Sequence, residues 1–129
     1  MRKRALVSLW IILFVSAGLV AEEATETSGL AIAVVGNNYC VGCTLKKTKG
    51  AAAQCSIYGH QHALKVERAT GEDGSTLTEL AGVTLFYLEN DQSTSLIKGE
   101  GTHGEKVKIT GSLFVDERIL QVDEYAVLP

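Results

Sequence analysis

Proline is almost absent from this chain. The single proline is the last residue, Pro129, and no long linker rich in turn-forming residues follows Ser28. The sequence also has no internal repeat and no low-complexity run. These absences exclude a repeat architecture and a string of linked domains, and they favour one domain.

Charge is missing from residues 5–21, which are almost entirely apolar. The basic residues 2–4 precede this run, and the polar, acidic segment 22–29 follows it. A basic start, an apolar centre and a small residue at the end are typical of a secretory signal peptide. We expect cleavage after Ala21, with Ala17 as the rival position, and a periplasmic or extracellular protein. An uncleaved anchor is the alternative, because a spanning helix needs about 17 to 25 apolar residues.

Positive charge is scarce once this leader is excluded. Residues 1–21 carry three of the 12 Lys and Arg residues and none of the 15 Asp and Glu residues, so the remainder has a net charge near −6. Binding to nucleic acid depends on a basic surface that neutralises phosphates. The composition therefore argues against a nucleic-acid partner, and against an anionic membrane surface once the signal peptide is removed.

Cysteine is also sparse, and its count is odd: Cys40, Cys43 and Cys55. None lies near Ala21, so lipid attachment there is not expected. In an exported protein, three cysteines allow at most one internal disulfide and leave one thiol over. That thiol is then free, bound to a metal, or paired with a second chain, which leaves a covalent dimer open.

Alternating and β-branched segments predict a mainly β domain over residues 30–127. The expected strands cover residues 30–35, 62–68, 83–88, 106–113 and 119–122. Between the first two strands, residues 39–60 hold every cysteine together with many glycine and alanine residues, and we interpret them as a long, irregular Cys-rich loop with at most one helical turn. Loops of this length in a compact domain are usually functional or cross-linked.

One short helix is expected between the third and fourth strands. Asn90 or Asp91 can cap its start, and Gly99 follows its expected end at Lys98. In the fourth strand, Gly111 is a candidate bulge. Five strands with one helix in this position match a small Greek-key barrel of the OB type. An open β-sandwich or a different strand order is the rival interpretation.

The sequence resembles small exported bacterial OB-like proteins that contain cysteines and have no known function. The motifs that carry the likeness are Tyr39-Cys40-Val41-Gly42-Cys43, Gln54-Cys55, Gly59-His60 and Lys106-Val107-Lys108-Ile109-Thr110-Gly111. The likeness extends over most of residues 30–125. It implies a barrel and export, but no activity. The pair of histidines in His60-Gln61-His62 departs from the pattern expected of that group.

The cysteines and two histidines form a candidate metal site. Thiolate and imidazole are ligands that suit zinc and copper, and C-x-x-C lets two sulfurs meet one ion. If the second strand begins at His62, this ring shares a strand face with Leu64 and Val66. The candidate ligands are Cys40, Cys43, Cys55, His60 and His62.

Two other interpretations of the cysteines remain open. A structural disulfide from Cys40 or Cys43 to Cys55 is the default in an oxidising compartment, and it would stabilise the fold by roughly 3 kcal/mol. Thiol-disulfide chemistry would need a thiol of low pKa. Thr44 follows the second cysteine, so the C-x-x-C-H pattern of covalent haem attachment is not met.

The remaining polar residues point to no catalytic machinery. His103 is most simply a solvated loop histidine, although a loop between helix and strand can reach a barrel mouth. Lys46, Lys47 and Lys49 are interpreted as a solvated face. No G-x-S-x-G nucleophile motif is present, and the acidic residues are scattered. We therefore expect an exported binding or structural module, rather than an enzyme, with a disulfide-pinned Cys-rich loop and an unidentified protein or small ligand as its partner. A periplasmic copper- or zinc-binding protein and a thiol-disulfide oxidoreductase are the alternatives.

Overall fold

The computed structural model describes residues 29–129, so the expected signal peptide and most of the acidic segment after it lie outside the described residues. The described part is mainly β, with five strands, three short α-helices and two short 3-10 segments. No helix within it is long and apolar enough to cross a membrane. In chain order the elements are β1 (Leu30–Cys40), α1 (Val41–Lys49), α2 (Cys55–Tyr58), β2 (His62–Gly71), η1 (Thr78–Leu80), β3 (Thr84–Tyr87), α3 (Thr94–Lys98), η2 (Glu100–Thr102), β4 (Lys106–Phe114) and β5 (Ile119–Val127).

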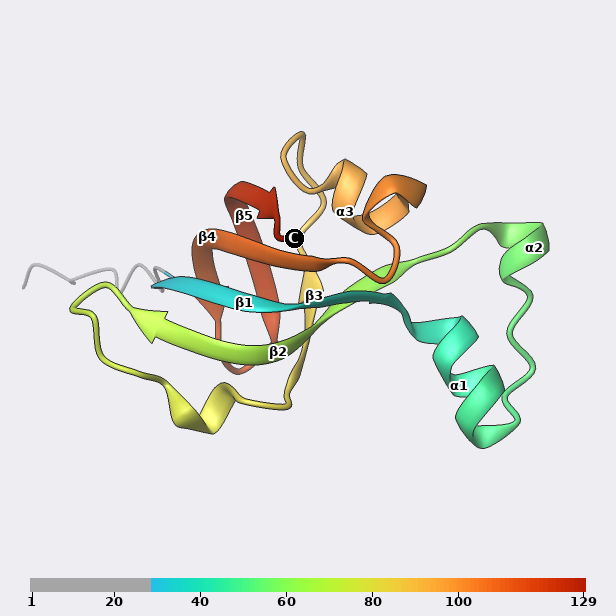
Figure 1. Ribbon diagram of the computed structural model, residues 1–129, viewed down its shortest axis with the longest axis horizontal. Coiled ribbons are helices and arrows are strands. Elements are labelled where there is room, and N and C mark those ends of the chain that lie inside the picture. Colours follow the sequence, from blue (N-terminus) through green and yellow to red (C-terminus); the bar gives the residue numbers. More distant parts are fainter. Residues whose placement is uncertain (1–28) are drawn as a thin grey trace, which may run out of the picture.

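The five strands form one sheet whose pairing closes on itself (Figure 1). The order of hydrogen-bonded neighbours is β1-β2-β3-β5-β4, and β4 pairs again with β1. All pairs are antiparallel except β3 with β5. The predicted mainly β, five-stranded class is confirmed, and the strands do not separate into two sheets.

Strand β4 shows why the alternating pattern was informative. Val107, Ile109 and Leu113 are buried, whereas Lys108 is exposed, as expected for a strand with one face in the core. The register against β5 shifts at Gly111, which confirms the predicted bulge. A side chain on Gly111 would overlap the carbonyl oxygen of Gln121, and glycine permits this close approach.

The Cys-rich segment 39–60 is not an irregular loop. Strand β1 continues to Cys40, and the chain then forms α1 and, after a short extended stretch, α2. Helix α1 buries none of its side chains. It therefore lacks the apolar stripe by which a helix is recognised in a sequence.

The predicted helix before the fourth strand is present but shorter than expected. Residues 91–93 form a turn, and α3 begins at Thr94. The Asn90 side chain does cap this turn, since its Oδ1 accepts the N–H groups of Gln92 and Ser93 at 3.0 and 2.9 Å. Gly99 ends α3 as predicted.

Candidate metal centre

The candidate residues lie where the end of β1 meets the start of β2. Cys40 closes β1 and pairs with His62, which opens β2. The connection formed by residues 41–61 therefore leaves the sheet and returns to it at one place, and Figure 1 shows α1 and α2 extending beyond that end. The loop before β4 joins them, because the N–H of Gly104 donates to the carbonyl of Asn38 at 2.7 Å. Three segments far apart in the sequence converge here.

Four of the predicted ligands form one compact group. One donor atom from each of Cys40, Cys43, Cys55 and His60 lies within 4.8 Å of all the others. The Sγ atoms of Cys40 and Cys55 are 3.6 Å apart, and Cys43 Sγ lies 3.4 Å from His60 Nδ1. Zinc bonds of about 2.3 Å to sulfur and 2.0–2.1 Å to nitrogen place tetrahedral ligands about 3.8 Å (S to S) and about 3.6 Å (S to N) apart. These two separations are within a few tenths of an ångström of the tetrahedral values, and the remaining donor pairs lie within 4.8 Å.

Gly42 allows the third sulfur to approach. A Cβ atom at this position would lie 2.9 Å from Cys55 Sγ and 3.2 Å from the Cβ of Ala53. Glycine inside a helix costs about 0.8–1.0 kcal/mol relative to alanine, so its presence in α1 works against local helix stability. The close contact with the Cys55 sulfur provides a reason for it.

The sulfur of Cys40 ionises more readily than an ordinary cysteine thiol. It caps the N-terminus of α1 and accepts the N–H of Cys43 at 3.4 Å. Burial opposes its ionisation, but hydrogen bonds from the N–H groups of Cys43 and Gln61, from His60 and from the Cys43 thiol lower its pKa to about 6. Positive partial charge at a helix N-terminus acts in the same direction.

The neighbouring thiol of Cys43 shows the opposite behaviour. Hydrogen bonds to Cys40 and then to Cys55, followed by burial, raise its pKa to about 12. Ionisation of Cys40 is thus favoured and ionisation of Cys43 beside it is disfavoured. A bound cation would compensate the charge of further thiolates.

The three histidines form a second group. Donor atoms of His60, His62 and His103 also lie within 4.8 Å of one another. His62 Nε2 is 3.3 Å from His103 Nδ1, and the ring centroids of His60 and His103 are 4.8 Å apart. His62 is only 2 % exposed, and its pKa is lowered, first of all by burial, which favours the neutral ring that binds metals.

Asn38 holds the segments of this end together. Its Nδ2 donates to the carbonyl of Leu96 at 2.9 Å and to the carbonyl and Oγ1 of Thr102 at 3.1 Å each. Its Oδ1 accepts the hydroxyl of Tyr87 at 2.9 Å. The Leu96 carbonyl belongs to the last turn of α3, where carbonyls lack partners within the helix, and it also receives His62 Nδ1 at 2.9 Å.

The structure brings all the predicted ligands to one end of the sheet but divides them. Cys40, Cys43, Cys55 and His60 form the first group, whereas His62 groups with His60 and His103. His60 is common to both. The sequence had indicated one set of five ligands.

The predicted disulfide is not formed in this structure. All three cysteines are free thiols, and the Cys40–Cys55 separation of 3.6 Å far exceeds the S–S bond length of about 2.05 Å. The sulfurs instead converge on one another and on His60 as a hydrogen-bonded group.

His103, which the sequence indicates as a solvated loop residue, belongs to the histidine group. It is exposed, as a loop histidine is expected to be, but its ring packs edge-on against both His60 and His62. Its position before the fourth strand was the one signal that could have pointed to the site. The three lysines of α1 are exposed, as predicted.

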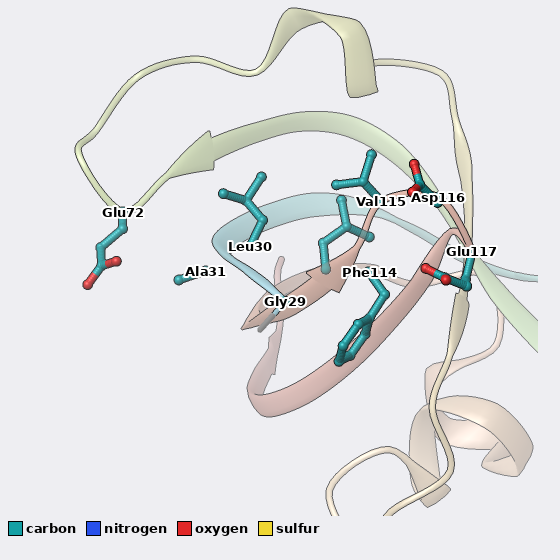
Figure 2. Close-up of a pocket in the computed structure, with 9 residues that line it drawn as sticks. Gly29, Leu30, Ala31, Glu72, Phe114, Val115, Asp116 and Glu117 are labelled. Carbon is teal, nitrogen blue, oxygen red and sulfur yellow. The ribbon is translucent and has the colours of Figure 1, made fainter. Parts of the chain in front are cut away.

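A separate cleft of about 490 Å³ lies between the start of β1 and the turn after β4 (Figure 2). Its lining contains no cysteine or histidine. The carboxylates of Asp116 and Glu117 lie on that turn, and Figure 2 shows Glu72 on the far side, away from them. Glu72 is therefore separated across the cleft from the two acidic residues of the turn.

Comparison of this chain with family models, curated proteins and solved structures finds no match.

Proposed function

We propose that this protein is a small exported metal-binding protein that holds one ion of zinc or copper(I) between Cys40, Cys43, Cys55 and His60. The observation that carries the proposal is the convergence of three sulfurs and one imidazole nitrogen within 4.8 Å. Soft thiolates together with imidazole favour zinc or copper(I) over harder cations. The resemblance to exported proteins and the signal-peptide pattern support a role outside the cytoplasm.

The donor number favours retention of the ion over catalysis. Four protein ligands fill a tetrahedral zinc site, whereas catalytic zinc sites usually keep one position for water or substrate. A Cys₃His site is of the closed kind. The proposed role is therefore to bind, store or pass on metal, and the ion would also hold the 41–61 connection in place.

We interpret the domain as an OB-type barrel. A closed five-strand order with β1 beside β4 and a helix between β3 and β4 supports this. In OB folds the connection between the first two strands commonly takes part in ligand binding. Here that connection carries Cys43, Cys55 and His60, and the C-x-x-C motif begins just before it, at Cys40, the last residue of β1.

Mass spectrometry of the protein expressed from the full 129-residue chain tests the proposal. After purification without added metal under mild reduction and incubation with zinc, the native spectrum should show a zinc adduct that denaturation removes. Cys55→Ser should weaken this adduct at least tenfold, and Ser56→Ala, an exposed neighbour on α2, should leave it unchanged. A denatured mass two hydrogens below the free-thiol value, with no zinc bound after reduction, would contradict the proposal.

Thiol-disulfide exchange is the second candidate, and the lowered pKa of Cys40 favours it. The Cys40 thiolate would attack a substrate disulfide and release one substrate thiol. Cys55, whose sulfur is 3.6 Å away, would then attack Cys40, form a Cys40–Cys55 disulfide and release the second substrate thiol. Reduction of a disulfide-linked peptide tests this route, and an unchanged rate in Cys40→Ser would exclude it.

A further inference from the structure

We propose that His60, His62 and His103 form a second metal site, which binds a divalent transition-metal ion beside the thiolate centre and shares His60 with it. This site goes beyond the proposed function, because two of its three ligands are not part of the Cys₃His group. Three imidazoles suit zinc and copper(II). The two centres would thus differ in ligand softness while lying next to each other.

The tautomer of His62 leaves its Nε2 atom able to bind a metal ion. Its Nδ1 lies 2.9 Å from the carbonyl oxygen of Leu96. A carbonyl can only accept a hydrogen bond, so Nδ1 carries the proton and Nε2 of the neutral ring holds a free lone pair. An imidazole whose other nitrogen donates to a backbone carbonyl is the usual arrangement of a metal-ligating histidine, because that bond fixes the ring and raises its basicity.

The lone pair of His62 is directed at the other histidines. Its Nε2 lies 3.3 Å from His103 Nδ1, and two nitrogens bound tetrahedrally at about 2.0–2.1 Å from zinc are separated by about 3.3–3.4 Å. The ring centroids of His60 and His62 lie 4.8 and 4.9 Å from that of His103. Three imidazoles so close would repel one another if all were protonated, whereas one cation bound between their neutral rings would be held by three lone pairs.

His60 can serve both centres because imidazole has two nitrogens. Its Nδ1 lies 3.4 Å from Cys43 Sγ, which assigns this nitrogen to the thiolate centre. The opposite nitrogen, Nε2, is then the one available to an ion held by His62 and His103. With both ions bound, the His60 ring would release its remaining N–H proton to solvent and bridge the ions as an imidazolate, because a neutral imidazole offers only one lone pair.

The second site would exchange its ion more readily than the first. It offers three protein ligands, so a water molecule would complete a tetrahedron. His103 is exposed and belongs to the loop between η2 and β4, whereas none of the four ligands of the thiolate centre is exposed. One ligand of each centre, His62 and Cys40, is buried. The histidines therefore present the accessible position at which ions arrive from solvent.

Zinc stoichiometry of the full chain tests this site separately from the thiolate centre. Each centre has a ligand of its own: His103 for the histidine site and Cys43 for the thiolate site. Under mild reduction with added zinc, native mass spectrometry should show two ions on the wild-type protein and one each on His103→Ala and Cys43→Ser. The double variant should bind none. Glu105→Ala, an exposed substitution in the same loop, should retain two.

The outcomes separate the two proposals. One ion on the wild type that His103→Ala keeps and Cys43→Ser loses would overturn the histidine site and leave the thiolate centre standing. One ion that His103→Ala loses and Cys43→Ser keeps would support the histidine site and contradict the thiolate centre. Cobalt(II) provides an independent readout. A charge-transfer band from thiolate to cobalt should persist in His103→Ala. The band should vanish from a triple variant in which Cys40, Cys43 and Cys55 are all replaced by Ser. If His103→Ala lowers stability, His103→Gln repeats the count with a side chain of similar size.

Discussion

Replacement of Asn38 by alanine should destabilise the protein more than any other single polar substitution at this end of the sheet. The Asn38 side chain is fully buried and joins β1 to α3, to η2 and to β3 through Leu96, Thr102 and Tyr87. None of these contacts is local in the sequence. Their loss therefore acts on tertiary structure rather than on one element.

The cost can be worked out partner by partner. The Leu96 carbonyl keeps His62 Nδ1 as a donor, and the Thr102 carbonyl keeps the N–H of Glu105. Among residues 29–129, by contrast, only Asn38 Oδ1 is a hydrogen-bond partner of the Tyr87 hydroxyl. An unsatisfied buried group costs about 1–3 kcal/mol and each lost hydrogen bond about 1 kcal/mol net. The free energy of unfolding should therefore fall by about 3–5 kcal/mol, a large part of the 5–15 kcal/mol typical of a domain.

Urea denaturation of matched variants checks this reasoning. Asn37→Ala removes the same side chain from the adjacent, exposed position and should change the free energy of unfolding by less than about 0.5 kcal/mol. Tyr87→Phe removes the hydroxyl that Asn38→Ala would orphan. The double variant should then be more stable than the sum of the single effects predicts. A loss below about 1 kcal/mol in Asn38→Ala, or strict additivity with Tyr87→Phe, would refute the account.

Three further predictions concern the sulfur group, the ion and pH. Gly42→Ala should lower zinc affinity at least tenfold, because the added Cβ would lie 2.9 Å from the Cys55 sulfur. Competition with a chelator measures the affinity. Gly101→Ala is the control and should show no change, because the space around Gly101 is open. Zinc at 100 times its dissociation constant should raise the free energy of unfolding by about 2.7 kcal/mol. In a thermal melt, zinc should raise the melting temperature and a chelator should reverse the change. Equal melting temperatures with and without zinc would count against a zinc site in the folded protein. The Asp73 carboxylate accepts the hydroxyl and N–H of Ser75 at 2.6 and 2.9 Å, which lowers its pKa. Because the folded-state pKa is the lower one, the stability that Asp73 adds is complete above its usual pKa near 3.9 and is lost as the pH falls further. Denaturation of wild type and Asp73→Ala at pH 6 and at pH 2.5 should show the gap between them closing at low pH, and a gap that widens would reverse the sign of this linkage.

Much of the sheet could be predicted from the sequence because its strands alternate. In β4, Val107, Ile109 and Leu113 point inward at a period of two, and Gly111 marks the bulge. In a half-buried strand, consecutive side chains alternate between the core and solvent. The resulting alternation of apolar and polar residues allows such a strand to be recognised from a single sequence. The extension of β1 to Cys40 was not predicted, because Asn38 is a polar residue that is buried only through contacts with segments distant in the sequence.

The sequence alone also supplied the residue types of the candidate centre, since its cysteines and His60 and His62 lie within 23 residues. It left a disulfide, a metal site and thiol-disulfide chemistry open as interpretations of them. The tertiary structure decided how those ligands divide. Cys40 faces His62 because β1 and β2 pair in that register, and His103 arrives from 41 residues further along the chain. Asn38, which holds this loop and α3 in place, resembles any other asparagine in the sequence. Local sequence patterns reflect the burial of residues that are neighbours in the chain. The candidate site is assembled from five separate segments: β1, α1, α2, β2 and the loop before β4. Its geometry depends on how these segments pair and pack, which no local pattern specifies.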